Sequence, residues 1–332
     1  MGPPLAAPEN EGQSMTRASR RLLLGGLTAS LAAPALGQPA RPITIVVPFA
    51  PGGSTDVLSR LMAERMTQIL GQNVLVENRA GGNTIVGAEY VARAQPDGAT
   101  LLMAAGTTLT INPVVVKNLP YKVEDFAPIT LATTYPFGIL AQNRGPADIP
   151  AFVAAAKAKP GQITYGTNGP TTLTNVAMLL VCDRLGIQMQ DVTYRGDSAA
   201  LNDFLAGNLD TLVVAGSTAV PVFRNGQGRL LAWTSKQRMP TTPEVPTIAE
   251  FAPDTEALSW FGLLAPARTP AELVQKLNSA AVESLRDPRI QERLTRDAQF
   301  ILGGTPTEFA QFLRDQDRQW RPILSKLDVQ NQ

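Results

Sequence analysis

The sequence predicts an α/β fold organised in two lobes, and three observations lead to that prediction. Short β-branched apolar runs alternate with segments whose apolar residues recur at helical spacing, a pattern typical of parallel strands joined by helices. This strand, loop and helix unit occurs twice before residue 110, and a similar series follows residue 150. With 332 residues, of which 44% are apolar, the chain is long enough to bury the cores of about two domains.

The first 37 residues are expected to be an export signal. Arg17, Arg20 and Arg21 precede an uncharged apolar stretch, residues 22–36, which is shorter than the roughly 20 residues that a membrane-spanning helix needs. The small residues that end this stretch predict cleavage after Gly37. The paired arginines fit both the twin-arginine route and the general secretory route.

The first α/β series follows directly. Its strands are β-branched apolar runs, expected at residues 42–49, 74–77 and 100–105. The helix after the first strand begins in the turn at Pro51 to Asp56 and stops at Gly71. Asn83 is expected to cap the next helix, which runs to about Ala94.

A long extended stretch, residues 129–142, leads into the second series. Its strands are expected at 163–165, 192–194, 212–215 and 230–234. Its helices are expected at 151–159, from Leu173 onward, and at 198–206 after the cap Asp197. The two series suggest the two lobes.

The remaining chain is expected to return to the first lobe and end in helices. Residues 239–253 are Pro-rich and predict a connector, and residues 260–265 predict a strand. Thr269 and Thr305 each begin a Thr-Pro-x-Glu sequence, which fits a capping box with proline at the first helical position. The apolar stripes of these two helices are interpreted as packing surfaces.

Composition excludes several classes of function. The 29 Lys and Arg residues balance 28 Asp and Glu residues, and no basic block marks a nucleic-acid surface. The absence of histidine removes the commonest general base and metal ligand, and a single cysteine forms no disulfide within the chain. We therefore expect no metal, no cofactor and no nucleic-acid partner.

Known catalytic and phosphate-binding motifs are also missing. Gly52-Gly53-Ser54-Thr55-Asp56 is not G-x-S-x-G, because Asp56 replaces the last glycine and no histidine is present to activate the serine. The sequence has no G-x-G-x-x-G, and no glycine-rich stretch before Lys-Ser or Lys-Thr. Cys182 lies beside the apolar face of its helix, so we expect a buried small side chain rather than a nucleophile.

The segment from Phe49 to Asp56 is the most informative candidate site. It follows the first strand and begins the first helix, where unpaired backbone N–H groups and the helix dipole favour an anion. Gly52 and Gly53 allow the backbone to approach such a ligand closely. A plain strand-to-helix turn with Ser54 or Thr55 as the N-cap is the alternative interpretation.

A matching loop in the second lobe, residues 166–172, favours the ligand-binding interpretation. It is rich in small hydroxyl and amide side chains and stands at the same kind of strand-to-helix junction. Two such junctions facing across a cleft would hold a small anion without any lysine or arginine. Arg195, which follows a strand, fits either a bidentate carboxylate partner or an exposed ion pair.

Three stretches resemble the tripartite tricarboxylate transporter receptor family, also called Bug proteins: PITIVVPFAPGGSTDVLSRLMAE, VLVENRAGGNTIVGAEYVARAQPDGATLL and INPVVVKNLPYKVEDFAPIT. The resemblance covers essentially all of residues 41–322. It implies a two-lobed periplasmic-binding-protein fold, type II-like, with two crossover strands at 129–142 and 260–265 and a C-terminal helical tail. The expected division is lobe 1 at 38–137 plus 258–332 and lobe 2 at 138–257.

The resemblance also implies how a ligand is held. In that family a ligand carboxylate meets main-chain N–H groups and ordered water at the first loop. The ligand-binding residues that follow for this sequence are Phe49, Ala50, Gly52, Gly53, Ser54, Asp56, Gly106, Thr107, Thr167, Asn168, Gly169, Thr171, Thr172, Arg195, Asp197, Gly216 and Ser217.

Two departures from the family pattern put the identity of the ligand in doubt. Many members end the second-lobe loop in Gln-His, whereas residues 169–175 contain no histidine. Asp197 stands where small residues are frequent, and its charge would repel a second ligand carboxylate or accept a hydrogen bond from an ammonium or amide group.

The resulting expectation is a monomeric periplasmic receptor and not an enzyme. It would capture a small carboxylate or related polar metabolite between its lobes and deliver that ligand to transporter membrane subunits. Two alternatives stay open: a ligand-binding accessory protein of a sensor kinase, and an enzyme.

Overall fold

The structure is a computed structural model that describes residues 2, 41–167, 169, 171–194 and 197–325. The compact unit begins at Arg41. The predicted export signal lies outside the described residues except for Gly2, and so do the candidate site residues Asn168 and Arg195.

Strands and helices alternate along the described chain, as the sequence pattern predicts. The strands are β1 Ile43–Val47, β2 Val74–Asn78, β3 Thr100–Ala105, β4 Phe126–Ala141, β5 Thr164–Thr167, β6 Gln190–Thr193, β7 Thr211–Ala215, β8 Arg229–Trp233, β9 Leu258–Pro266 and β10 Phe300–Ile301. The α-helices are α1 Ser54–Leu70, α2 Ile85–Ala92, α3 Asn112–Val115, α4 Ile149–Ala158, α5 Leu173–Leu185, α6 Asp197–Ala206, α7 Gly216–Arg224, α8 Ala271–Ser284, α9 Pro288–Arg296 and α10 Pro306–Leu324. Shorter helical turns are η1 Thr107–Ile111, η2 Val123–Asp125 and η3 Ile248–Glu250.

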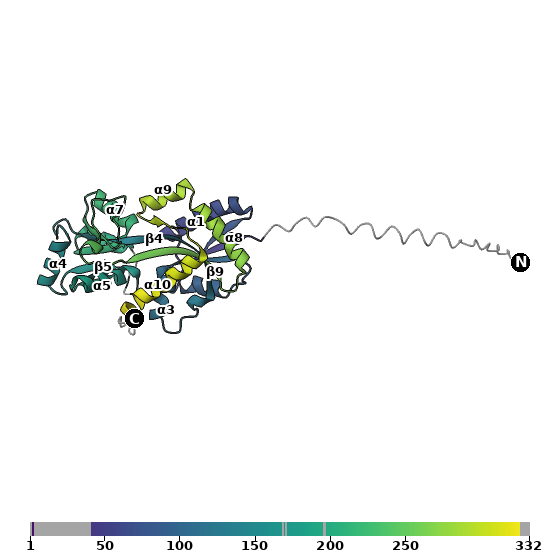
Figure 1. The fold of residues 1–332 in the computed structure, drawn as a ribbon, viewed down its shortest axis with the longest axis horizontal. Helices are drawn as coiled ribbons and strands as arrows, with labels where there is room; N and C mark the ends of the chain where they lie inside the picture. The colour runs from purple at the N-terminus through teal and green to yellow at the C-terminus, as the bar shows by residue number, and fades with distance from the viewer. Residues whose placement is uncertain (1, 3–40, 168, 170, 195–196, 326–332) are drawn as a thin grey trace. The chain divides into compact units, whose positions relative to one another are not determined.

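Strand β4 joins two halves of one sheet with the strand order β2-β1-β3-β9-β4-β7-β5-β6. Its first part, Phe126 to Pro136, pairs with β9, and its last part, Phe137 to Ala141, pairs with β7. Figure 1 shows α4, α5 and α7 gathered at one end of β4 and α1 and α8 at the other. Strand β9 returns the chain to the first half, where its first residue, Leu258, lies opposite Pro136.

The first half has a core on each side of the sheet. In β1, Ile43, Ile45 and Val47 pack with Met62 and other α1 side chains on one face. On the other face, Val46 packs in the cluster that contains Val91 of α2. A strand buried on both faces requires an almost continuous apolar run, which explains the ITIVV sequence of β1.

The C-terminal helix α10 packs against both halves. Near its start, Phe309 contacts Trp260 of β9 with ring centroids 5.5 Å apart. Near its end, Trp320 and Leu324 belong to the cluster built around Val176 and Val181 of α5. The predicted apolar stripe of the last helix is therefore confirmed as a packing surface.

Two of the predicted helix caps are wrong, and one is confirmed. Asn83 does not cap α2, because it adopts a left-handed conformation and its side-chain amide donates to Asn112 instead. Helix α8 has Pro270 as its N-cap, without a side-chain cap hydrogen bond, so the box predicted at Thr269 does not form. Thr305 does form its box, because its hydroxyl accepts from the Glu308 N–H and the Glu308 carboxylate accepts from the Thr305 N–H.

The structure contains further helices that the sequence analysis did not predict, including η1, α7 and α9. Helix α7 contains Pro221, which is uncommon inside a helix, and the apolar face of α9 consists of only Ile290 and Leu294, which is too short a pattern to predict a helix. Within the described ranges, no helix combines the length and apolar character needed to cross a bilayer.

Cys182 is buried in α5, as predicted, and burial raises the pKa of its thiol to about 12. Because the thiolate is the reactive form, the folded protein at pH 8 should react with a thiol-specific chromogenic reagent at least about 100-fold more slowly than urea-unfolded protein. The sequence has one cysteine, so the absorbance change reports this thiol alone. Equal rates in the folded and unfolded states would contradict the buried placement.

Candidate functional site

A cleft of about 420 Å³ lies where the loop after β1 approaches the starts of α5 and α7. This volume falls in the range of pockets that hold small metabolites. The cleft is lined from both halves of the sheet, by Phe49, Gly53, Ser54, Thr55, Asn83, Ala105, Thr107, Tyr135, Phe137, Thr172, Leu173, Thr174, Ala215, Ser217, Ser259, Phe261, Asp297 and Gln299.

The first-half wall of the cleft is the start of α1. Gly53 is the N-cap residue, with φ −74° and ψ 169°, and no side chain caps the helix. The interpretation of Ser54 or Thr55 as the N-cap is wrong, because the helix already begins at Ser54. The first N–H groups of a helix have no partner within the helix, so α1 can offer them to a ligand.

Asp56 fixes this loop. The residue is 3% exposed, and its carboxylate accepts hydrogen bonds from Gly52 N at 2.9 Å, Asn78 Nδ2 at 2.9 Å and Arg60 Nε at 3.0 Å. Burial acts to raise the pKa of Asp56, but the hydrogen bonds from Arg60, Gly52 and Asn78 outweigh burial and hold the pKa below its usual value. Asp56 therefore organises the loop from behind, and Gly52 supplies the left-handed turn at φ 89°.

The second-half wall is the start of α5. Thr172 is its N-cap residue, and the Thr172 hydroxyl donates to the Gly169 carbonyl at 2.6 Å instead of capping the helix. Thr167 is 1% exposed and donates to Asp191, so it supports the loop from within. Leu173 and Thr174, the first residues of α5, face the cleft.

A third helix also begins at the cleft. Helix α7 follows Ala215, which provides no side-chain cap, and Ser217 in its first turn lines the cleft. By contrast, α4, α9 and α10 begin away from the cleft, and their N-cap residues Asp148, Asp287 and Thr305 all accept hydrogen bonds from the helix. Three uncapped helix N-termini therefore converge on one cavity.

Aromatic side chains provide an apolar surface between these helix starts. Tyr135 lies with its ring centroid 5.1 Å from Phe261 and 5.9 Å from Phe137. All three come from the central strands β4 and β9, and all three line the cleft. Such a surface suits the carbon chain of a ligand whose polar ends meet the helix starts.

The segment after α9 adds two polar residues that the sequence analysis missed. Asp297 ends α9, and its Oδ2 accepts from Arg293 Nε at 2.7 Å. Gln299 Oε1 accepts from the Thr133 hydroxyl at 2.8 Å. No motif marks either residue, because the tertiary fold alone brings this segment to β4.

The structure divides the candidate residues from the sequence analysis into two groups. Those that line the cleft are Phe49, Gly53, Ser54, Thr107, Thr172 and Ser217. The candidates whose side chains are described and that do not line it are Ala50, Gly52, Asp56, Gly106, Thr167, Gly169, Thr171 and Gly216. Gly106 instead provides contact between the halves, since an added Cβ would lie 2.3 Å from Leu173 Cδ1.

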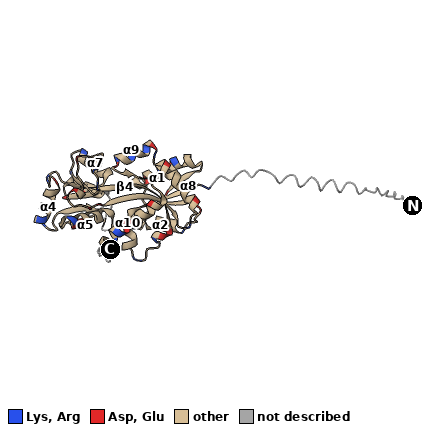
Figure 2. Cartoon of the chain, in the orientation of Figure 1, with Lys and Arg blue, Asp and Glu red and all other residues tan. Residues whose placement is uncertain are grey.

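The cleft contains an unusual balance of charge. Among the described residues that line it, none is a lysine or arginine, and Asp297 is the one charged side chain. Figure 2 shows the charged residues mainly on the helices, with β4 drawn in tan. Among the described residues, backbone dipoles rather than side-chain cations therefore supply the positive potential at this site.

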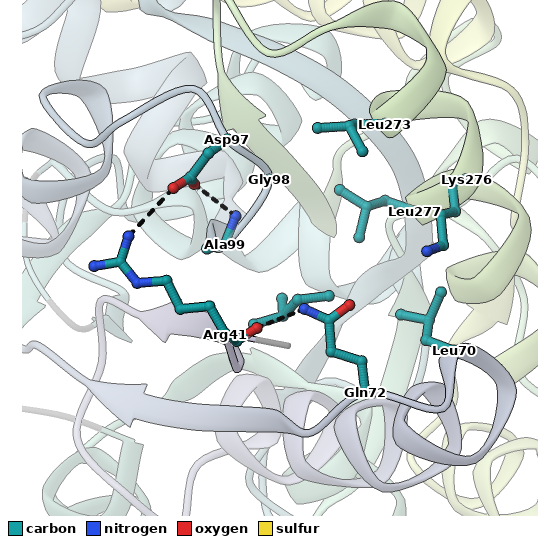
Figure 3. A pocket seen from close by; sticks show the side chains of 10 residues that line it. Arg41, Leu70, Gln72, Asp97, Gly98, Ala99, Leu273, Lys276 and Leu277 are labelled. Carbon is teal, nitrogen blue, oxygen red and sulfur yellow. Dashed lines mark hydrogen bonds and ion pairs between the residues drawn. The ribbon is translucent and has the colours of Figure 1, made fainter. Parts of the chain in front are cut away.

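A second depression, shown in Figure 3, is smaller, at about 150 Å³. It lies at the start of β1, where the Arg41 side chain pairs with Asp97 at 3.4 Å and Gln72 Nε2 donates to the Arg41 carbonyl. Ligands of parallel sheets bind beyond the carboxyl ends of the strands, which is the opposite end of β1. We therefore assign the candidate site to the larger cleft.

Comparison with known proteins gives relatives along nearly the whole chain. The family described as tripartite tricarboxylate transporter family receptor matches residues 58–329. The chain is 34% identical over 316 residues to the UPF0065 protein in the tcbD-tcbE intergenic region of Pseudomonas sp. (strain P51), which covers 92% of this chain and 94% of the relative. It is 31% identical over 303 residues to BugT of Bordetella pertussis, which covers 90% and 93%.

Solved structures share the fold. A protein described as a periplasmic transporter is 34% identical, with a TM-score of 0.77, and covers 88% of this chain and 98% of its own. MatC from Rhodopseudomonas palustris, solved with bound malate, is 30% identical with a TM-score of 0.74 and covers 86% and 100%. Another R. palustris protein, solved with adipate, is 28% identical with a TM-score of 0.77 and covers 86% and 96%.

Proposed function

Because the chain belongs to the tripartite tricarboxylate transporter receptor family, we propose that it is a periplasmic receptor for a small carboxylate. The ligand binds in the cleft between the halves and is delivered, unchanged, to the membrane subunits of a tripartite transporter. The similarity to proteins solved with malate and adipate supports a carboxylate as the ligand class.

The observation that carries this proposal is the convergence of three uncapped helix N-termini on one cavity. Helices α1, α5 and α7 each begin at the cleft without a side-chain cap hydrogen bond. Each N-terminus has free N–H donors and about half a positive charge, so the three together stabilise an anion. The missing cap alone would be weak support, because α8 also lacks one.

The two lobes of the proposed receptor are residues 38–137 with 258–332, and residues 138–257. The change of partner along β4 supports this division, because β4 leaves β9 after Pro136 and meets β7 from Phe137. The return connection is supported by the hydrogen bond from Ala257 N to the Thr234 carbonyl, just before β9 begins. Ligand that bridges α1 and α5 would favour the closed arrangement of the lobes.

Binding without turnover fits the chemistry of the lining residues. The hydroxyl groups of Ser54, Thr107, Thr172 and Ser217 have no histidine to activate them, since the sequence contains none. The proposed role of these groups is to donate and accept hydrogen bonds. We also propose that the receptor is a monomer and that it works in the periplasm. The similarity to a protein described as a periplasmic transporter supports this location.

The proposal is tested by identifying what the protein carries. Mass spectrometry of the denatured purified protein should release a small carboxylate, and that compound should raise the melting temperature when added back. Mass action predicts about 2.7 kcal/mol of added stability when the ligand concentration is 100 times its Kd. The proposal fails if a broad panel of carboxylates gives no shift, or if the bound compound is converted to a product.

A further inference from the structure

We propose that Asp297 and Gln299 select the class of carboxylate, and that the preferred ligand is a monocarboxylate whose far end carries an N–H donor, an amine or a carboxamide. This inference rests on the proposed function, because it assumes that the helix N-termini hold the first carboxylate. It concerns the part of the same ligand that lies toward α7, away from the starts of α1 and α5.

Both residues line the cleft, and each keeps one side-chain hydrogen-bonding group without a partner among the described residues. Gln299 is 8% exposed, and its Oε1 is held by the Thr133 hydroxyl. Within the described part of the chain its Nε2 has no partner, although the residue lines the cleft. Asp297 is also 8% exposed, and only its Oδ2 is paired with Arg293. One acceptor and one donor, two residues apart in the chain, are therefore available to a ligand.

The backbone fixes these side chains in place. The segment packs so closely on the first turn of α7 that a Cβ added to Gly216 would lie 2.4 Å from Ala298 Cβ and 2.7 Å from the Asp297 carbonyl oxygen. Ala298 adopts a left-handed conformation, with φ 54°, which an alanine rarely takes. Backbone strain of this kind is concentrated at functional sites.

The position of Asp297 is unfavourable for its own helix. It is the C-cap residue of α9, where the negative end of the helix dipole repels a carboxylate. Arg293 offsets part of this cost through its ion pair at 2.7 Å. Asp297 is buried, lines the cleft and lies at the end of its helix where a carboxylate is unfavourable. Ligand recognition therefore explains its presence better than stability does.

The charge beside the start of α7 then differs in sign from the charge at the starts of α1 and α5. The starts of α1 and α5 favour a carboxylate, whereas Asp297, in the segment packed on the start of α7, is the one charged residue among those that line the cleft in the described chain. A second ligand carboxylate near Asp297 would meet a like charge in a partly desolvated site. An amine or carboxamide there would donate to Asp297 Oδ1, and a carboxamide oxygen would also accept from Gln299 Nε2.

The test compares ligands of equal length by calorimetry on the complete mature protein. One series is succinate, its monoamide and 4-aminobutyrate, and the other is adipate, its monoamide and 6-aminohexanoate. In at least one series, we expect the monoamide or the amino acid to bind at least about tenfold more tightly than the dicarboxylate. The inference is overturned if, in both series, the dicarboxylate binds at least as tightly as the monoamide and the amino acid. The proposed function would still stand in that case.

Two variants separate recognition from a structural effect. Asp297→Asn removes the charge, so the preference over the dicarboxylate should fall at least about tenfold. Arg293→Gln, the matched control, keeps the carboxylate and removes its competing cation, so the preference should stay or increase. If Asp297→Asn weakens the binding of every ligand equally, the ratio of their affinities does not change. That result indicates a structural effect alone and would overturn the inference. If no compound binds the wild type, the proposed function fails together with it.

Discussion

Gly53→Asp should abolish the stabilisation of the protein by its ligand while the unliganded protein still folds. Gly53 has an ordinary φ of −74°, and an added Cβ would meet only the Ala50 carbonyl oxygen, at 3.9 Å. Aspartate is also a favourable N-cap residue, so the apo variant should be as stable as the wild type or more stable, by about a few tenths of a kcal/mol. Its carboxylate, however, would satisfy the N–H groups of α1 that the ligand needs and would repel the ligand carboxylate. We expect at least about a 100-fold loss of affinity.

Gly53→Asn is the matched control for that variant. Asparagine has almost the same size and also caps helices well, but it carries no charge. Its ligand affinity should therefore fall less than that of Gly53→Asp, while both apo proteins melt at similar temperatures. The comparison is made by thermal shift and calorimetry with the co-purified compound. A full ligand response in Gly53→Asp would show that α1 does not hold the ligand carboxylate.

Asp56→Ala should have the largest effect on stability. The substitution removes the carboxylate that accepts hydrogen bonds from the Gly52 N–H, the Asn78 amide and the Arg60 guanidinium. The Gly52 N–H and the Asn78 amide then lack this acceptor. We expect the free energy of unfolding to fall by about 2–3 kcal/mol and the ligand affinity to fall with it, because the loop before α1 loses its anchor.

Glu64→Ala provides the control for Asp56→Ala. Glu64 is an acid of the same helix and also pairs with an arginine, Arg289, but that pair is exposed. Its removal should change stability by at most about 1 kcal/mol and should leave ligand affinity unchanged. Urea denaturation measures both variants. An Asp56→Ala protein as stable as Glu64→Ala would contradict the anchoring role.

The contribution of Asp56 should also depend on pH in a defined direction. Its pKa is lowered in the folded protein, relative to about 3.9 in an unfolded chain. The stabilisation is therefore complete above about pH 4 and is lost as the pH falls through the folded-state pKa. The stability difference between the wild type and Asp56→Ala should be constant near neutral pH and should narrow below pH 4. A stability difference that widens below pH 4 would contradict a lowered pKa of Asp56 in the folded protein.

Local sequence rules succeeded where a residue needs only its near neighbours. The Thr305 capping box forms because the threonine and the glutamate lie within one helical turn. Gly71 ends α1 for a similar reason, since it takes the left-handed conformation that glycine tolerates. Thr269 shows the same motif as Thr305, yet its helix begins without the box. Tertiary packing therefore decides between two locally equivalent sites.

The sequence by itself determined the alternation of strands and helices, the burial of Cys182, the family and the placement of Gly53 at a helix start, because each depends on contiguous residues. Only the tertiary structure decided that α7 is a third helix start at the cleft and that Asp297 and Gln299 stand there. Gln299 meets Thr133 across 166 residues of sequence. The charge and the selectivity of such a site depend on contacts between segments that are distant in the sequence. Local sequence patterns do not predict those contacts.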